Sequence, residues 1–179
     1  MKTTQILIAG FGGQGILFSG KFLAYKGLTE DLQVSWLPSY GPEMRGGTAN
    51  CNVILSDSPV GSPIITTPDV LIAMNLPSLQ KYVNTVAKGG QIYIDSSLID
   101  AKVERDDVEV FYIPATQMAK DEGIATLANM IIVGHLLENH PELSFEGTET
   151  VVEKLVPPKK AALKELNIKA LALGRDYKN

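Results

Sequence analysis

Short apolar runs alternate with amphipathic stretches along most of the chain, and this alternation predicts the secondary structure. Residues 5–9 (QILIA) are apolar almost throughout and are followed by glycines, which is typical of a strand buried on both faces of a parallel sheet. Strands are expected at residues 5–9, 33–37, 49–55, 69–75, 91–95 and 108–113, and helical sequence at 15–25, 78–87, 125–139, 148–155 and 160–173. Alternating elements of this kind indicate an α/β protein.

The connection before the third expected strand indicates the direction of that strand. Residues 38–47 contain three glycines and two prolines. Ten residues of this kind are too few and too broken for the crossover helix that joins parallel neighbours, so strand 49–55 is expected to run antiparallel or to sit apart. Every second residue from Ala49 to Leu55 shares one face, and Cys51 is therefore interpreted as a small core residue.

The second half of the chain is expected to be helical. His135 lies in this helical sequence and is interpreted as structural, beside an apolar stripe formed by Leu127, Met130, Ile131, Gly134 and Leu137. The fold class expected is α/β: a single Rossmann-like three-layer domain over residues 1–179, with a mostly parallel sheet, one antiparallel strand and a helical C-terminal part.

Composition narrows the possible functions. A length of 179 residues suits one domain, and 45% hydrophobic with 20% charged residues excludes general disorder. Because Cys51 is the only cysteine, a disulfide scaffold and a cysteine-ligated iron–sulfur cluster are excluded. His135 and His140 lie five residues apart, which does not place two ligands on one helix face, so no metal site is expected.

Charge and hydropathy argue against nucleic acid and membrane as partners. The net charge is -4, and no basic stripe offsets it. No apolar run approaches the roughly 18 residues needed to cross a bilayer, and the start of the chain has no signal-peptide pattern. We therefore expect a cytoplasmic protein.

A glycine-rich turn is the strongest local motif. The sequence GFGGQG at residues 10–15 follows an expected strand and precedes an expected helix, the context that gives G-x-G-x-x-G its meaning. Glycines permit a tight turn, and the helix N-terminus offers N–H groups to phosphate or carboxylate. The candidate binding residues here are Gly10, Gly12, Gly13, Gln14 and Gly15.

Two nucleotide-binding motifs are only partly matched. A dinucleotide site needs an acidic residue at the end of the second strand, where this chain has Leu37, Pro38 and Ser39. The P-loop pattern that starts at Gly15 reaches Lys21 but continues with Phe22 in place of Ser or Thr. NAD binding and NTPase activity are both disfavoured.

Residues 39–47 form the most distinctive loop, at the carboxyl end of an expected strand, where open α/β sheets place ligands. An arginine beside free backbone N–H groups suits an anion or a phosphate. The candidate cofactor-binding residues in this loop are Ser39, Gly41, Glu43, Arg45, Gly46 and Gly47. The alternative is a structural turn in which Glu43 pairs with Arg45, and the residues alone leave the two readings open.

The same region also suits a protein interface. Aromatic residues and methionine are enriched at buried interface centres, and the candidate anchors are Trp36, Tyr40, Pro42 and Met44. No nucleophile, base or paired carboxylate stands out in the sequence, so no catalytic residue is predicted.

GFGGQG, the segment SWLPSYGPEMRGGTANCNVILSD at residues 35–57, and Asn129-Met130 together resemble the gamma subunit of the 2-oxoacid:ferredoxin oxidoreductases. The resemblance implies an enzyme that uses thiamine diphosphate, iron–sulfur clusters and coenzyme A to convert a 2-oxoacid to an acyl-CoA and reduce ferredoxin. It implies alpha and beta partner subunits, in some cases also delta, with thiamine diphosphate held between alpha and beta.

From this resemblance, the chain is expected to complete the assembly, to help to form the coenzyme A cavity and to be inactive alone, and no cofactor is assigned to the chain by itself. Pyruvate, 2-oxoglutarate and ketoisovalerate types all remain open, with 2-oxoglutarate favoured. An isolated chain is expected to cover an apolar partner surface as a homodimer. The alternative from another functional class is a free-standing Rossmann-type nucleotide-binding module.

Overall fold

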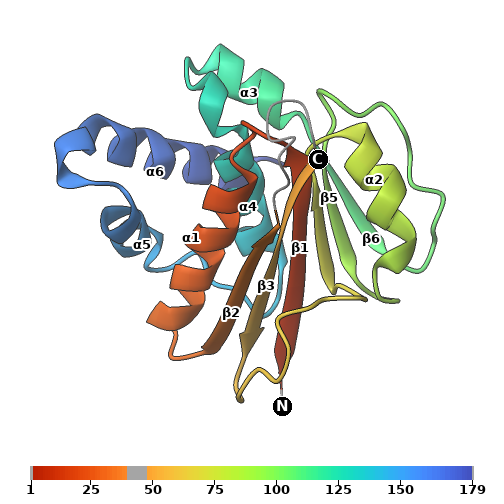
Figure 1. The fold of residues 1–179 in the computed structure, drawn as a ribbon. Coiled ribbons are helices and arrows are strands. Elements are labelled where there is room, and N and C mark those ends of the chain that lie inside the picture. The colour runs from red at the N-terminus through yellow and green to blue at the C-terminus, as the bar shows by residue number, and fades with distance from the viewer. Residues whose placement is uncertain (1, 40–47, 179) are drawn as a thin grey trace.

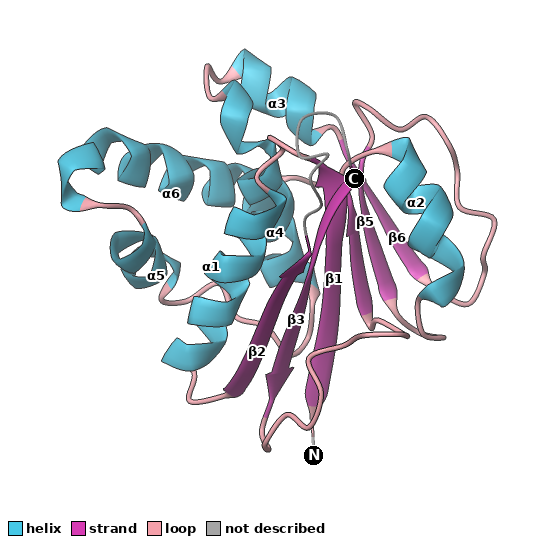
Figure 2. Cartoon of the chain, viewed as in Figure 1, coloured by secondary structure: helices cyan, strands magenta, loops and turns pink. Residues whose placement is uncertain are grey.

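The computed structural model describes residues 2–39 and 48–178 and is organised around one six-stranded sheet, shown in Figures 1 and 2. The strand order across the sheet is β2-β3-β1-β4-β5-β6. The strands are β1 (Thr3–Phe11), β2 (Gln33–Ser39), β3 (Thr48–Ser56), β4 (Val70–Ala73), β5 (Gln91–Asp95) and β6 (Glu109–Ile113). All six predicted strands are confirmed, although β1 extends two residues beyond the predicted strand at each end.

The direction predicted for the third strand is confirmed. β3 pairs antiparallel with both of its neighbours, β1 and β2, whereas β1, β4, β5 and β6 pair parallel. β3 therefore lies inside the sheet as the one reversed strand. The sheet is mostly parallel, as predicted.

Helices cover both faces of the sheet and give three layers (Figures 1 and 2). α2 lies on one face, and α1, α4, α5 and α6 lie on the other. The helices are α1 (Ile16–Thr29), α2 (Leu76–Tyr82), α3 (Ala115–Asp121), α4 (Ala128–Asn139), α5 (Thr148–Leu155) and α6 (Ala161–Asp176). Three short 3₁₀ turns are η1 (Val83–Thr85), η2 (Ala125–Leu127) and η3 (Pro158–Lys160).

The alternation along β1 explains why both faces are covered. Ile6 and Ile8 belong to the larger core beneath α1 and α4, whereas Leu7 belongs to the smaller core beneath α2. Side chains of successive strand residues point to opposite faces, so a continuous apolar run must be covered on both sides. Cys51 on β3 is fully buried in the larger core, which confirms its interpretation.

The residues of the apolar stripe expected at 125–139 are all buried, but burial extends around the whole circumference of α4. Ten of its twelve residues are buried, between the sheet and α6. The close approach of α6 depends on two glycines. A Cβ atom at Gly134 would lie 2.0 Å from the carbonyl oxygen of Leu171, and one at Gly174 would lie 1.8 Å from that of Ile131.

Several predicted helix bounds differ from those observed. The predicted helix 78–87 is α2 followed by η1, and it starts earlier because Asn75 Oδ1 accepts a hydrogen bond from the Ser78 N–H at 2.8 Å. α1 continues four residues beyond its predicted end, and Gly27 lets it lie close to Leu55 of β3. The first three residues of the helix predicted at 125–139 form η2. The helix predicted at 160–173 is α6, preceded by η3, whose last residue is Lys160, and α6 ends three residues later than predicted, at Asp176. Among the described residues, no helix combines the length and the apolar character that a membrane span requires.

Candidate functional site

The glycine turn joins β1 to α1 at the carboxyl end of the sheet. Gly13 and Gly15 have φ angles of 95° and 76°, in the left-handed region that favours glycine. At Gly10 a Cβ atom would lie 2.7 Å from Gln14 Oε1 and 2.8 Å from the Cβ of Met74. The glycines therefore meet a backbone and packing requirement in this structure.

Gln14 fixes the shape of this turn. Its Oε1 accepts a hydrogen bond from the Phe11 N–H at 2.7 Å, and its Nε2 donates to the carbonyl oxygen of Met74 at 2.9 Å. Both ends of the amide are thus occupied within the chain, and they tie the turn to the end of β4. Gln14 is placed to position the backbone of the turn, whereas the sequence suggested it as a binding residue.

The N-terminus of α1 is open to a ligand. Gly15 is the N-cap, no described side chain caps the helix, and its first turn contains no acidic residue. A hollow of about 290 Å³ lies against this end, lined by residues of the glycine turn, the first turn of α1 and Ala49 of β3. Uncapped N–H groups and the helix dipole favour an anionic group at such a position.

The topology brings the second candidate region to the same edge of the sheet. Phe11 pairs with Thr48 and Ser39 pairs with Asn50, so both ends of the connection between β2 and β3 lie beside the glycine turn. Ser39 is exposed there. The remaining residues proposed from the loop lie outside the described residues: Tyr40, Gly41, Pro42, Glu43, Met44, Arg45, Gly46 and Gly47.

Asn129, at the start of α4, also supports the glycine turn. Its Nδ2 donates to the carbonyl oxygen of Gly15 at 3.2 Å and to Ser19 Oγ at 2.9 Å, across 114 and 110 residues of sequence. Asn129 is only 4% exposed. The sequence analysis named Asn129 only as part of the family resemblance. The one sequence signal for its role at the turn was a polar amide within an apolar helical stretch.

Trp36 and Cys51 lie on the face of the sheet covered by α1. Trp36 on the edge strand β2 is 37% exposed, so the one interface candidate that the structure describes does present surface to solvent. Burial raises the pKa of the Cys51 thiol to about 12, against a smaller opposing effect of its hydrogen bond with Trp36. A thiol held protonated in this way is unsuited to bind a metal.

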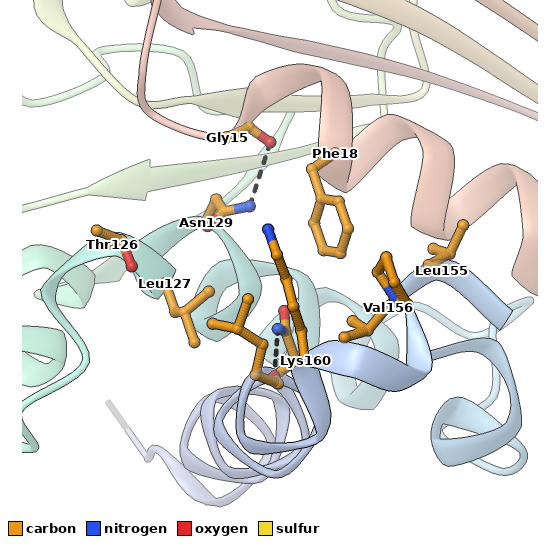
Figure 3. Close-up of a pocket in the computed structure, with 11 residues that line it drawn as sticks. Gly15, Phe18, Thr126, Leu127, Asn129, Leu155, Val156 and Lys160 are labelled. Carbon is orange, nitrogen blue, oxygen red and sulfur yellow. Dashed lines mark hydrogen bonds between the residues drawn. The ribbon is translucent and has the colours of Figure 1, made fainter. Parts of the chain in front are cut away.

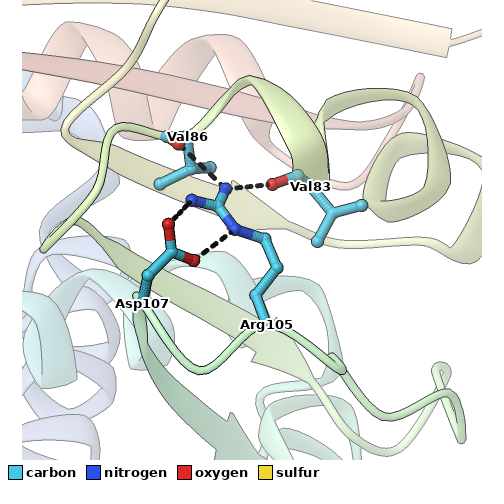
Figure 4. A network of polar contacts seen from close by, with 4 residues as sticks. All are labelled: Val83, Val86, Arg105 and Asp107. Carbon is cyan, nitrogen blue, oxygen red and sulfur yellow. Dashed lines mark hydrogen bonds and ion pairs between the residues drawn. The ribbon is translucent and has the colours of Figure 1, made fainter.

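Arg105 forms a polar network near α2 that has a structural role (Figure 4). Its guanidinium binds both carboxylate oxygens of Asp107 at 2.8 and 2.9 Å and donates to the carbonyl oxygens of Val83 and Val86, each at 2.8 Å. The hydrogen bonds from Arg105 lower the pKa of the Asp107 carboxyl. These hydrogen bonds of the Arg105 guanidinium join the end of α2 to the segment that enters β6.

Comparison with known proteins identifies the family. The pattern of the "Pyruvate ferredoxin/flavodoxin oxidoreductase" family matches residues 5–177. The chain belongs to this family. It is 35% identical to ketoisovalerate oxidoreductase subunit VorA of Methanothermobacter marburgensis, over 98% of this chain and 37% of that protein. It is 34% identical to 2-oxoglutarate synthase subunit KorC of the same organism, over 96% of this chain and 95% of that protein.

Solved structures of this oxidoreductase family agree with the fold. The gamma subunit of a keto/oxoacid ferredoxin oxidoreductase from Geobacter sulfurreducens superposes with a TM-score of 0.79 at 29% identity, covering 97% of this chain and 96% of that one. A 2-oxoglutarate:ferredoxin oxidoreductase from Magnetococcus marinus, solved with 2-oxoglutarate, coenzyme A and succinyl-CoA bound, gives 0.87 at 25% identity, over 98% of this chain and 31% of that one. The chain is therefore of the gamma-subunit type, as the resemblance implied.

The residues present fit only some of the cofactors that the resemblance implies. Within residues 2–39 and 48–178, no three His, Cys, Asp or Glu side chains lie together as a metal site, and the sequence has one cysteine. The chain therefore lacks the thiolates that an iron–sulfur cluster needs. The uncapped N-terminus of α1 does fit a phosphate-bearing group such as coenzyme A.

Proposed function

We propose that this chain, as a single domain, is the gamma subunit of a 2-oxoacid:ferredoxin oxidoreductase and forms part of the coenzyme A cavity. The observation that carries the proposal is the open N-terminus of α1, which lies at the same sheet edge as both ends of the loop that contains Arg45. Backbone N–H groups and an arginine together suit the phosphates of coenzyme A. The bound coenzyme supplies the thiol that accepts the acyl group.

In this proposal each described residue has a limited task. Gly13 and Gly15 allow the backbone to approach a phosphate closely, and Gln14 holds the turn in place. Asn129 fixes the N-cap of α1 from the other side. Thiamine diphosphate and the iron–sulfur clusters belong to alpha, beta or delta partner subunits in the cytoplasm, and electrons leave through ferredoxin. The isolated chain is therefore inactive.

2-Oxoglutarate is the substrate we favour. Relatives named 2-oxoglutarate synthase subunit KorC are matched along nearly their whole length, whereas the VorA protein is matched over 37% of its length. The Magnetococcus enzyme, which was solved with 2-oxoglutarate and succinyl-CoA, has the high TM-score of 0.87. These likenesses support succinyl-CoA as the product of the complex.

Purification through a tag on this chain, under anaerobic conditions from its native cell, tests the proposal. We expect partner subunits, thiamine diphosphate and iron to co-purify, and 2-oxoglutarate to be oxidised fastest among pyruvate, ketoisovalerate and aryl 2-oxoacids when coenzyme A is present. A lone chain that carries NAD or no ligand would instead favour the free-standing nucleotide-binding module.

Two substitutions separate ligand binding from subunit contact in residues 39–47. Arg45→Ala is expected to raise the KM for coenzyme A while the complex stays assembled, with Arg175→Ala, a change at a half-exposed arginine on α6, as its control. If Arg45→Ala leaves this KM unchanged, Arg45 does not bind the coenzyme. Tyr40→Ala is expected to weaken subunit association, which size-exclusion chromatography measures.

A further inference from the structure

Two buried asparagines line one cavity beside the glycine turn. The cavity, about 330 Å³, lies between α1, α4 and α6, and Figure 3 shows the residues that line it. Asn129 of α4 and Asn167 of α6 are 4% and 3% exposed. The Oδ1 atom of each is buried and has no hydrogen-bond partner among the described residues. Unpaired buried acceptors are uncommon in folded proteins, so this pair calls for an explanation.

The orientation of both amides is fixed by their other end. Asn129 Nδ2 donates to the carbonyl oxygen of Gly15, and Asn167 Nδ2 donates to that of Leu163 at 2.7 Å. Rotating either amide by 180° would set two oxygen acceptors against each other. The unpaired atoms are therefore acceptors, and a ligand that satisfies them must bring N–H or O–H donors.

The rest of the cavity limits the chemistry of that ligand. Apart from its amides and Thr126, the cavity has mostly apolar walls that include the rings of Phe18 and Pro157. Among the described residues that line the cavity, Lys160 is the one that carries a charge. It forms no ion pair with any described residue and reaches across the cavity toward Asn129 in Figure 3. A complementary ligand thus combines a flat apolar part, N–H donors and negative charge.

The geometry points to an adenine nucleotide as the occupant, with the base between the two amides and its phosphates near Lys160. The faces of adenine suit the rings of Phe18 and Pro157, and its exocyclic amine has two N–H donors for the Asn129 and Asn167 oxygens. The phosphates would lie between Lys160 and the uncapped first turn of α1.

This inference rests on the proposed function, because coenzyme A contains such a nucleotide. The two hollows share Gly15 and Phe18 as lining residues, so one molecule can extend from this cavity to the glycine turn. The pantetheine arm of the same coenzyme has amide donors but no charge, and it would leave Lys160 without a function. The nucleotide end explains the amides and the lysine together.

The base itself provides the decisive comparison. Adenosine 3′,5′-bisphosphate and inosine 3′,5′-bisphosphate differ at the exocyclic position, where inosine places a carbonyl oxygen against the two acceptors. We expect the adenosine compound to bind the full chain in calorimetry, and to compete with coenzyme A in the purified complex, about tenfold or more tightly than the inosine compound. Pantetheine alone is expected to bind much more weakly.

Three variants test whether the preference for adenosine over inosine arises in this cavity. Asn167→Leu is expected to abolish the preference for adenosine over inosine, whereas Asn84→Leu, the same change at an exposed asparagine, should keep it. Lys160→Met should weaken both bisphosphates by a similar factor and leave their ratio unchanged. The comparison of bases on the unmodified protein needs no variant, so it holds even where a substitution impairs folding.

The outcomes separate this inference from the proposed function. If coenzyme A binds but the two bases bind equally, or if Asn167→Leu keeps the preference, the base lies elsewhere and only the inference fails. If coenzyme A and its fragments bind neither the chain nor the complex, the proposed function fails as well. If NAD binds through the same asparagines and coenzyme A does not, the cavity holds a nucleotide from another source.

Discussion

Replacing Gly134 by alanine tests the closest helix contact in the structure. The added Cβ atom would lie 2.0 Å from the carbonyl oxygen of Leu171, and 2.8 and 2.9 Å from its carbonyl carbon and Cα. All three atoms are backbone, so no side chain can rotate away. Because Cβ contacts under 3.0 Å are essentially never seen, α4 and α6 would have to separate by about 1 Å.

Two opposing effects set the size of the change. Overpacking of a close-packed core costs about 1–3 kcal/mol, and here the upper part of that range applies because backbone must move. Alanine in a helix interior gains about 1 kcal/mol over glycine. We therefore expect Gly134→Ala to lower the free energy of unfolding by about 2 kcal/mol, which corresponds to roughly 4–8 °C in Tm for a chain of this size.

Urea denaturation followed by circular dichroism measures this change. Gly61→Ala is the matched control, because a Cβ atom at Gly61 would meet nothing within 4 Å. Gly174→Ala opens the same contact from α6, so the double variant should cost less than the sum of the two single variants. A midpoint for Gly134→Ala equal to or above that of the unmodified chain would refute the close packing of α4 on α6.

Three further predictions concern buried or bridging polar groups. Burial lowers the pKa of His135, whose Nδ1–H donates to the carbonyl oxygen of Gly174 at 3.0 Å. Below pH about 6.5 the unfolded chain therefore binds a proton that the native chain does not, so the free energy of unfolding falls as the pH drops. His135→Gln should reduce this fall, measured by urea titrations at pH 7.5 and 5.5. Gln14→Ala removes both hydrogen bonds that hold the glycine turn, and should lower the free energy of unfolding by about 1–3 kcal/mol. It should also raise the KM for coenzyme A, and an unchanged KM would contradict the positioning role of Gln14. Cys51, buried with a pKa of about 12, should not react with a disulfide reagent in the native chain but react fully in urea, and rapid native labelling would show that α1 opens readily.

The sheet was predictable because the signals for it are local. Each strand is a short apolar run, and runs such as Gln91–Asp95 are recognisable without knowledge of the rest of the chain. The reversal of β3 followed from the ten residues before it, which cannot hold a crossover helix. The position of the glycine turn at the carboxyl edge followed from the same reasoning.

The features that could not be predicted depend on contacts between distant residues. α3 was not predicted, because its start is fixed by the buried Asp95, which accepts a hydrogen bond from the Thr116 N–H 21 residues away. The role of Asn129 at Gly15 spans 114 residues, and no periodicity reveals it. The burial of α4 beyond its apolar stripe could not be predicted, because the approach of Gly174 to its outer face cannot be read from either helix alone.

The long pairing of β1 with β3 has a consequence for how quickly a ligand can bind. Nine residues of β1, up to Phe11, pair with β3, and the strand is also joined to β4 on its other side. The backbone that enters the glycine turn is therefore held still before any ligand arrives, and little entropy remains to be lost there on binding. A ligand that binds at this edge should then need no prior ordering of β1. Its association rate should be set by diffusion and by access to the glycine turn.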